Sequence, residues 1–278
     1  MMNKFLNLVS ILSCLVLLSL NAYAVDLPEN CPDDMAKILK RGALIVGIYY
    51  KDKPPFVMTG KSGELYGFDI DLAKDIAQKL GVGIEFNNEA TSYQELHDFA
   101  ARGKVDVVIC KFSRTYHRAK NLKFTTPYLT LKRAMLVNKM YAAKHGITEY
   151  PMDFLKENNV KIGVREKTSY VEFARNTFPK ARIVEGKWEQ LIKDLQANRI
   201  QALVRDEYVI RTLLRNNPEK ALYFSVYLLK DQKDYIAMAV PQDSTQLLYW
   251  LNMYLDTKAL NKDVADLINE YPELLKGK

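Results

Sequence analysis

The sequence is poor in the side chains that hold metals and form disulfides. Only three cysteines and three histidines occur among its 278 residues. The histidines, His97, His117 and His145, are scattered, and neither a CxxC nor an HExxH spacing occurs. Zinc sites and catalytic histidine sites need clustered ligands or a defined spacing. The sequence therefore argues against both kinds of site, and we expect no metal and no cofactor.

Long hydrophobic runs are also scarce. One apolar run, Leu8–Leu20, follows Lys4 and ends at Ala22–Ala24. It has about 13 residues, fewer than the ~20 that span a bilayer. Its small-x-small ending predicts a signal peptide over residues 1–24, cleaved after Ala24, and hence export to the periplasm. Lipid attachment at Cys14 is the alternative, although the apolar run continues past this residue.

The remaining cysteines, Cys31 and Cys110, leave room for one disulfide at most. They could join in an oxidising compartment, or stay unpaired with one of them buried. The distance between their Cα atoms decides which holds, and the sequence does not give that distance. Both outcomes stay open.

Long blocks of one charge are missing as well. The net charge of +7 falls to +6 when Lys4 leaves with the signal peptide, and basic and acidic residues are interspersed. A nucleic-acid binder would gather its basic residues on one face or arm, so we expect no nucleic-acid partner. No later segment is apolar for 18 residues, which predicts a soluble mature chain with no membrane span. We expect a monomer.

What the sequence does contain is an alternation of short apolar runs and helical periods. Strands are predicted over 43–48, 84–86 and 105–109, and helices over 68–80 and 93–102. Gly81 and Gly103 supply the helix stops. Helix-length connections between apolar strands predict a parallel sheet with helices on both faces.

A second set of the same kind follows Pro127. Its predicted strands are 134–137, 160–164, 183–184, 200–204 and 235–240, and its helices are 170–176, 188–197, 208–215, 245–255 and 262–270, with an irregular polar stretch at 139–158. The two sets predict two similar lobes. In open α/β sheets, ligands bind beyond the carboxyl ends of the strands. The loops after Ile48, Ile109, Val164 and Val204 are therefore the candidate binding loops.

An ordered series of short motifs runs along the chain. It comprises LIVG (44–47), PPF (54–56), Gly63, GFDIDLA (67–73), LGV (80–82), GKVD (103–106), SRT (113–115) with Arg118–Ala119, FTTPY (124–128) and VKIGV (160–164). In order and spacing this series resembles the polar amino-acid-binding family of bacterial periplasmic solute-binding proteins. The resemblance spans about residue 40 to the C-terminus.

The resemblance implies an α/β fold of two Rossmann-like lobes joined by a two-strand hinge. This is the type II periplasmic binding protein fold, shared with the ligand-binding lobes of ionotropic glutamate receptors. Lobe 1 is expected over 25–132 plus 233–278 and lobe 2 over 133–232, with crossings near 130–133 and 230–235. The implied function is to capture a polar amino acid, or a close analogue, and deliver it to an ABC transporter permease. Such a protein is not an enzyme.

The family's ligand contacts map onto matching residues. Arg118 matches the arginine that grips the ligand α-carboxylate, as a guanidinium fork suits, and Ser113 would add a donor. Asp206 matches the acceptor of the α-ammonium group. The further ligand contacts implied by the match are Thr168 and Ser169 at a helix N-terminus, Tyr93, Tyr50 and Lys111. Alternatives stay open for three residues: a surface arginine for Arg118, a helix N-cap for Asp206 and a core aromatic for Tyr93.

The chain departs from the family pattern at three lysines. Lys53 stands where the family has an aromatic residue, Lys111 where it has a small one, and Lys167 where it has glycine. Tyr49 or Tyr50 is a candidate for the missing ring. The lysines either favour an anionic ligand side chain or point outward into solvent.

Two other functions are open. Exported cyclohexadienyl dehydratases resemble the same family, and such an enzyme would need a carboxyl acid in the cleft, for which Glu166 and Glu172 are candidates. The lysine substitutions also suit a signalling or adaptor protein whose cleft has drifted toward a protein partner.

Overall fold

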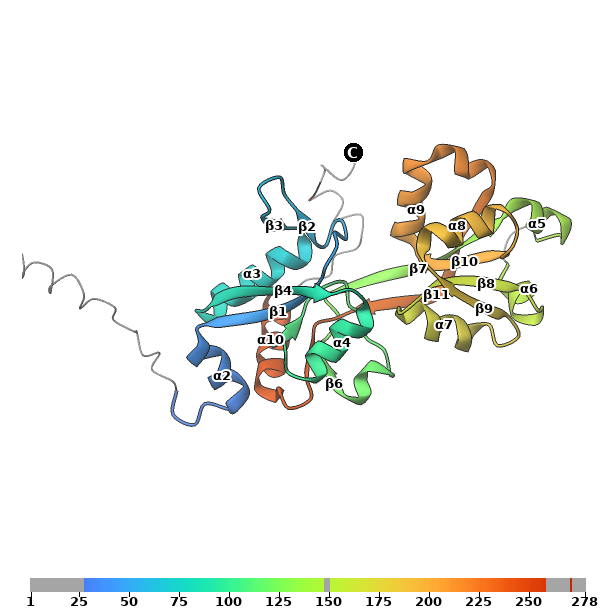
Figure 1. Ribbon diagram of the computed structural model, residues 1–278. Coiled ribbons are helices and arrows are strands. Elements are labelled where there is room, and N and C mark those ends of the chain that lie inside the picture. Colours follow the sequence, from blue (N-terminus) through green and yellow to red (C-terminus); the bar gives the residue numbers. More distant parts are fainter. Residues whose placement is uncertain (1–27, 148–150, 259–270, 272–278) are drawn as a thin grey trace, which may run out of the picture.

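The computed structural model describes residues 28–147, 151–258 and 271. The predicted signal peptide at 1–24 and the predicted helix at 262–270 lie outside the described residues. Figure 1 shows two α/β bodies side by side, with two long strands running between them. We call the body on the sheet β4-β1-β5-β12-β6 the first lobe, and the body on the sheet β11-β7-β10-β8-β9 the second lobe.

The first lobe contains both ends of the described chain. Its elements are α2 (Asp33–Arg41), β1 (Ala43–Tyr49), β2 (Met58–Thr59), β3 (Leu65–Tyr66), α3 (Phe68–Leu80), β4 (Gly83–Ala90), α4 (Tyr93–Ala101), β5 (Val107–Val108), the 3₁₀ turn η1 (Arg118–Lys120), β6 (Leu122–Phe124), β12 (Ala239–Pro241) and α10 (Thr245–Lys258). Strand β1 pairs in parallel with β4 and β5, whereas β12 pairs antiparallel with β5 and β6.

The second lobe repeats this plan with its own strands. Its elements are α5 (Lys139–Lys144), α6 (Met152–Glu157), β8 (Lys161–Arg165), α7 (Ser169–Thr177), β9 (Arg182–Gly186), α8 (Trp188–Gln196), β10 (Ala202–Asp206), α9 (Glu207–Asn216) and the 3₁₀ turn η2 (Pro218–Leu222). Strand β8 pairs in parallel with β9 and β10. The predicted alternation of strands and helices therefore holds in both lobes, but both sheets are mixed rather than parallel.

Strands β7 (Leu129–Asn138) and β11 (Phe224–Ile236) form the crossing between the lobes. They pair antiparallel, with an irregular register between Leu228 and Lys233. The predicted lobe limits at 132/133 and 232/233 fall inside these two strands and stay a prediction.

Several elements differ from the sequence-based prediction. The predicted strand at 235–240 is two strands, because the chain leaves one sheet at Ile236 and joins the other at Ala239. Between them, the Met238 N–H donates to Thr125 Oγ1. Helix α2, strand β6, most of strand β11 and the short β2–β3 hairpin were not predicted. The hairpin strands have two residues each, too few for a periodic pattern.

Side-chain alternation along β7 divides the core of the second lobe into two layers. Met135 and Val137 pack against α5, α6 and α7, whereas Ala134 and Leu136 pack against α8 and α9. Successive strand residues point to opposite faces, which produces this division. The buried side chains of the first lobe form one continuous cluster around β1, α3, α4 and α10.

Neither remaining cysteine is in a disulfide. Cys31 is half-buried and Cys110 is buried two residues after β5, where its sulfur accepts a hydrogen bond from the Tyr49 N–H. Burial raises the pKa of the Cys110 thiol to about 12. This residue is therefore a buried thiol behind the cleft rather than a reactive group.

Within the described residues, no helix has both the length and the apolar character that a membrane crossing requires. The same residues contain no group of three His, Cys, Asp or Glu side chains that could hold a metal ion.

Candidate functional site

A small cavity of about 20 Å³ lies between the two lobes. Its walls are Tyr93, Lys111, Ser113 and Arg118 from the first lobe, Thr168, Ser169, Tyr170, Arg205 and Asp206 from the second, and Asp234 from the crossing strand β11. Seven of the eight ligand contacts expected from the family resemblance thus come together here. Tyr50, the eighth, lies in an adjoining cavity.

The strand ends explain why these residues meet. Lys111 follows β5, Thr168 is the residue before α7, and Asp206 is both the last residue of β10 and the N-cap of α9. Carboxyl ends of parallel strands share one edge of a sheet, and the following helices begin there. The two lobes turn these edges toward each other.

Lys111 and Asp206 form an ion pair across the cavity. The Lys111 Nζ atom lies 2.8 Å from Asp206 Oδ2, and the two side chains are 9% and 0% exposed. The other oxygen, Asp206 Oδ1, accepts a hydrogen bond from the Val209 N–H at 3.0 Å. Burial opposes ionisation of Asp206, yet Lys111 and Arg205 beside it keep the carboxyl pKa below its ordinary value. The helix-cap alternative for Asp206 therefore holds, together with a lysine partner.

Asp69 holds the loop that carries Lys111. Its carboxylate is fully buried and accepts hydrogen bonds from the Lys111 N–H at 2.6 Å and from the Tyr128 hydroxyl at 2.9 Å. Lys111 has a left-handed backbone with φ of 45°, a conformation that favours glycine and is strained for a lysine. Burial raises the Asp69 pKa to about 7, against the lowering effect of these two hydrogen bonds.

Arg118 lies in the cavity wall and is 8% exposed. Its Nη1 atom donates to the Ser113 carbonyl at 2.8 Å, and its guanidinium lies 3.9 Å from the centre of the Phe112 ring. Burial lowers its pKa to about 10, partly offset by the negative charge of Asp234. The surface alternative for this arginine is wrong, because the side chain is buried in the cavity wall.

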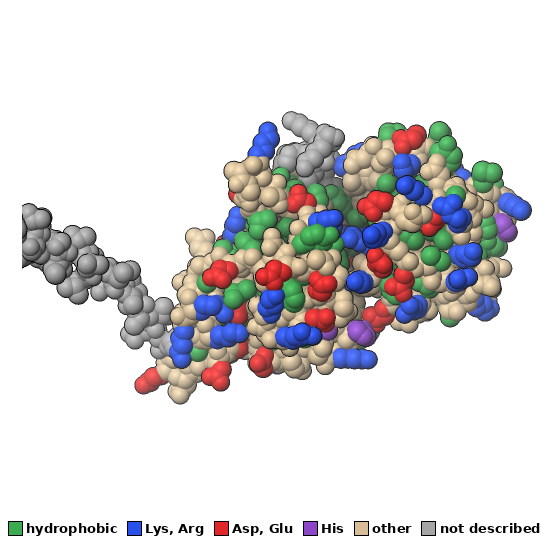
Figure 2. Space-filling view, in the orientation of Figure 1, with side chains coloured by type: hydrophobic (Ala, Val, Ile, Leu, Met, Phe, Trp, Pro, Cys, Tyr) green, Lys and Arg blue, Asp and Glu red, His purple; other side chains and the backbone are tan. Residues whose placement is uncertain are grey.

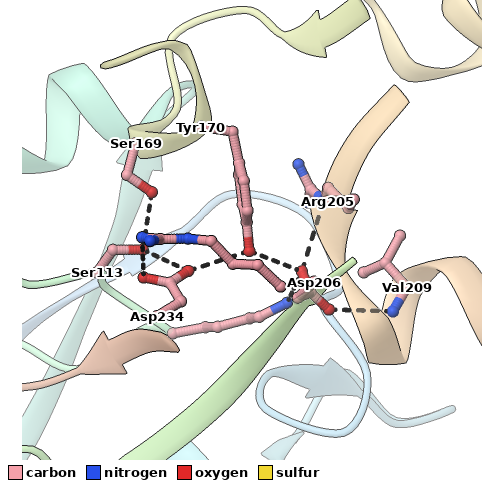
Figure 3. A network of polar contacts seen from close by, with 9 residues as sticks. Ser113, Ser169, Tyr170, Arg205, Asp206, Val209 and Asp234 are labelled. Atoms are coloured by element: carbon pink, nitrogen blue, oxygen red, sulfur yellow. Dashed lines mark hydrogen bonds and ion pairs between the residues drawn. The ribbon is translucent and has the colours of Figure 1, made fainter. Parts of the chain in front are cut away.

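A hydrogen-bond chain joins the two lobes in the cavity wall (Figure 3). The Ser169 hydroxyl donates to Ser113 Oγ at 2.9 Å, and the Ser113 hydroxyl donates to Asp234 Oδ2 at 3.1 Å. The Tyr170 hydroxyl reaches the same Asp234 oxygen at 3.0 Å and Asp206 at 3.3 Å. Ser113, expected as a donor to the ligand, thus has a carboxylate acceptor within the protein.

Arg205 is a buried cation with spare hydrogen-bond capacity. It is 6% exposed, and its Nε and Nη1 atoms have no hydrogen-bond partner among the described residues. The closest acid is Asp206, whose Oδ2 lies 3.6 Å from Nε. The guanidinium also packs over the rings of Tyr170 and Trp188.

Three wall residues, Tyr170, Arg205 and Asp234, were missed from the sequence. Tyr170 and Arg205 adjoin residues that the motif match had selected, so their neighbours were the available signal. Asp234 had none, because it sits in a strand whose course between the lobes only the fold reveals.

A second, outer cavity of about 360 Å³ adjoins the first, and Tyr93 and Thr168 line both. Tyr50 lies here and is 41% exposed. Tyr49 is the other candidate for the aromatic residue that the family has at the position of Lys53. It is buried and stacks on Tyr93, with ring centres 5.4 Å apart. Tyr93 is itself buried in that stack, so its core-aromatic role holds alongside its place in the wall.

Two of the three unusual lysines, Lys53 and Lys167, line this outer cavity. Lys53 lies over the Tyr49 ring at 4.3 Å, and burial, with help from Arg165 and Arg205, lowers its pKa to about 8. Lys167 has a left-handed backbone with φ of 56°, which fits the glycine that the family has there. Blue Lys and Arg side chains gather where the two lobes meet in Figure 2.

The chain matches the family model of bacterial extracellular solute-binding proteins, family 3, over residues 44–273. Among curated proteins it is 27% identical to the ABC transporter arginine-binding protein 1 of Escherichia coli K12 over 203 residues, which is 72% of this chain and 78% of the relative.

Two solved structures extend the comparison. The solute receptor for L-cysteine of Neisseria gonorrhoeae has a TM-score of 0.66 and 25% identity, covering 87% of this chain and 93% of the receptor. An ancestral amino acid-binding protein described as a precursor of cyclohexadienyl dehydratase has a TM-score of 0.63 and 28% identity, covering 86% and 98%. These structures confirm the predicted α/β fold of two lobes, the type II periplasmic binding protein fold.

Proposed function

The chain belongs to the bacterial extracellular solute-binding proteins of family 3, and from this premise we propose that it captures an amino acid or a close carboxylate analogue between its lobes. The observation that carries the proposal is Arg118, a buried guanidinium in the wall of an interlobe cavity. A buried arginine suits a carboxylate because its planar fork donates two parallel hydrogen bonds.

The N-terminus of α7 supports the same reading. Thr168 and Ser169 bring this helix end into the cavity, and a helix N-terminus favours an anion through its free N–H groups and its dipole. The Thr168 hydroxyl donates to the Arg165 carbonyl at 2.7 Å, which fixes the turn before the helix. A ligand carboxylate between Arg118 and α7 would touch both lobes.

Binding rather than catalysis is the function that the cavity favours. The pKa of Asp206 is held below its ordinary value and its carboxylate accepts a hydrogen bond from Lys111, so this group offers no proton to a leaving group. Asp234, the other carboxylate of the cavity, accepts hydrogen bonds from Ser113 and Tyr170. Glu166, a candidate acid, lies in the outer cavity. The arginine-binding and cysteine-receptor relatives bind solutes, which agrees with this choice.

Delivery of the captured solute to an ABC transporter permease in the periplasm completes the proposal. It rests on the transporter role in the names of the relatives and on the signal peptide expected at 1–24. We propose that the lobes close around the ligand, as in other hinge-bending proteins, and that the permease recognises the surface of this closed form.

Thermal unfolding of the wild type and of Arg118→Ala tests the proposal, with amino acids and their keto and hydroxy analogues as probes. A ligand at 100 times its Kd stabilises the folded state by about 2.7 kcal/mol, so the unfolding temperature should rise by several degrees for the wild type and should not rise for Arg118→Ala. Arg114→Ala, an exposed arginine of the same loop, is the matched control and should keep the response. Equal responses from the wild type and Arg118→Ala would contradict the proposal.

A further inference from the structure

The inner cavity is the one lined by Arg118 and Asp206, and it contains the ammonium group of Lys111. Lys111 Nζ lies 2.8 Å from Asp206 Oδ2, the carboxylate that the family resemblance assigns to the ligand ammonium. The same oxygen has the Tyr170 hydroxyl at 3.3 Å and Arg205 Nε at 3.6 Å. Two cations and one hydroxyl group thus lie close to a single carboxylate oxygen.

A ligand ammonium would meet two positive charges at this point. Inside a protein, like charges a few ångströms apart repel far more strongly than in water. To pair with Asp206, the ammonium would have to displace Lys111, whose backbone N–H is held by buried Asp69. The site therefore disfavours an α-ammonium group and leaves the carboxylate grip of Arg118 intact.

A second group of cations lies at the passage toward the outer cavity. Arg165 donates to the Tyr49 hydroxyl at 3.1 Å, Lys53 lies over the same ring, and Arg205 reaches this region from the second lobe. Among the described residues, neither Lys53 nor Arg165 has a carboxylate within ion-pair distance. These half-buried cations, and the unpaired Nε and Nη1 atoms of Arg205, would be stabilised by hydrogen bonds to a bound anion.

The charge balance of the cleft points the same way. The inner cavity is lined by three cations and two carboxylates, and the outer cavity by five cations and two carboxylates. Buried charges are stable when paired. Cations outnumber carboxylates in both cavities, so the excess positive charge is not confined to Arg118.

We infer that the cleft takes a dicarboxylate-class dianion that lacks an α-ammonium group. One carboxylate binds at Arg118, and the second binds among Lys53, Arg165 and Arg205. Lys111 fills the place of the ligand ammonium at Asp206 and is the residue that sets this specificity. The inference rests on the proposed function, since it names the ligand class of the same cavity.

Calorimetric titration with matched solutes tests the role of Lys111. 2-Oxoglutarate and L-glutamate differ only at the α-position, and L-arginine serves as the cationic solute. The wild type should bind 2-oxoglutarate at least about tenfold more tightly than L-glutamate, since one misplaced charge is worth 1.4 kcal/mol or more. In Lys111→Gly, which suits the left-handed backbone, the preference should reverse; Lys120→Ala, on the surface, should leave it unchanged.

A second titration tests the outer cations. 2-Oxovalerate has the chain length of 2-oxoglutarate but lacks its second carboxylate. Arg165→Gln should weaken 2-oxoglutarate about tenfold and leave 2-oxovalerate unchanged, because only the dianion uses this charge. Lys61→Gln, on the exposed turn between β2 and β3, is the control. An equal loss for both solutes would overturn the assignment of the second carboxylate.

The outcomes separate the inference from the proposed function. Tighter binding of L-glutamate or L-arginine by the wild type, lost in Arg118→Ala, would overturn the inference and leave the solute-binding function standing. Binding of no amino acid and no carboxylate by the wild type would overturn both.

Discussion

The two lobes share a sheet plan but bring different charges to the cleft. In each lobe, parallel strands are completed by antiparallel ones, and the binding loops follow the strand ends. The charged side chains that the first lobe presents to the two cavities are all cations, among them Lys53, Lys111 and Arg118. The second lobe, with its strand β11, presents a mixture of cations and carboxylates, and its buried carboxylates in the cavity walls are Asp206 and Asp234.

This difference indicates what holds the lobes together. The Lys111–Asp206 pair attracts them, and Ser113–Ser169 and Tyr49–Arg165 hydrogen bonds add to it. The remaining cations of the two lobes repel one another across the cleft. An anionic ligand would act as a counter-ion between the lobes, so closure and anion binding should be coupled.

Of the substitutions considered, Asp206→Asn should have the largest effect on the contact between the two lobes. Asparagine keeps the helix cap, but it leaves the buried Lys111 ammonium without a counter-charge, which costs about 3–5 kcal/mol in the closed arrangement. With saturating 2-oxoglutarate present, when the lobes of the parent are closed, we expect the lobes of this variant to stay apart, because an open cleft returns Lys111 to water. Fluorescence of Trp188, which lines the outer cavity, reports the opening in a Trp250→Phe background.

The control for this variant is Asp194→Asn, which removes an exposed ion pair with Arg199 in the same lobe. Its emission spectrum should match the parent. An Asp206→Asn spectrum that also matched the parent would refute the role given to the Lys111–Asp206 pair.

Substitution of glycines in corresponding strands should show that the core of the second lobe is packed more tightly around its glycine than the core of the first lobe. A Cβ at Gly163 in β8 would lie 2.5 Å from Leu203 and 2.6 Å from Ile200, whereas a Cβ at Gly47 in β1 would lie 3.2 Å from Val105. Overpacking of this kind costs about 1–3 kcal/mol. Gly163→Ala should therefore lower the free energy of unfolding more than Gly47→Ala does, as measured by urea denaturation. The opposite order would show that the second-lobe core yields more easily.

The pH dependence of stability should be concentrated in the first lobe. The folded-state pKa of Asp69 is raised to about 7, so between about pH 4 and pH 7 the folded state holds a proton that the unfolded state has lost. Stability from this group is full below its unfolded pKa and is lost as the pH rises through 7, with a slope of up to about 1.4 kcal/mol per pH unit. Urea titrations of Asp69→Asn should lack this slope; an unchanged slope would place its source elsewhere.

Lys53 should give the smallest effect, a modest pH dependence of binding. Its pKa of about 8 reflects burial and the neighbouring Arg165, Arg205 and Lys111. An anion beside it would raise that pKa, so binding of 2-oxoglutarate should take up protons near pH 8 and weaken above it. Calorimetry in two buffers of different ionisation enthalpy measures the uptake. Lys53→Gln should abolish it, and persistence of the uptake in that variant would exclude Lys53 as its source.

Much of this arrangement could be predicted from the sequence. Apolar runs and helix stops predicted the main elements of both lobes, and the motif series selected seven residues of the inner cavity wall. The antiparallel strands could not be predicted, because their direction depends on the crossing between lobes. The Lys111–Asp206 contact could not be predicted either, since the two residues are far apart in the chain and meet only through the packing of the two lobes.

Small-angle X-ray scattering of the wild type tests the central claim most directly, because it measures whether an anion in the cleft closes the lobes. The radius of gyration should fall when saturating 2-oxoglutarate is added, and it should not fall with L-arginine or in Arg118→Ala. A radius of gyration that is the same with every solute, or that falls equally in Arg118→Ala, would contradict an anion held between the lobes.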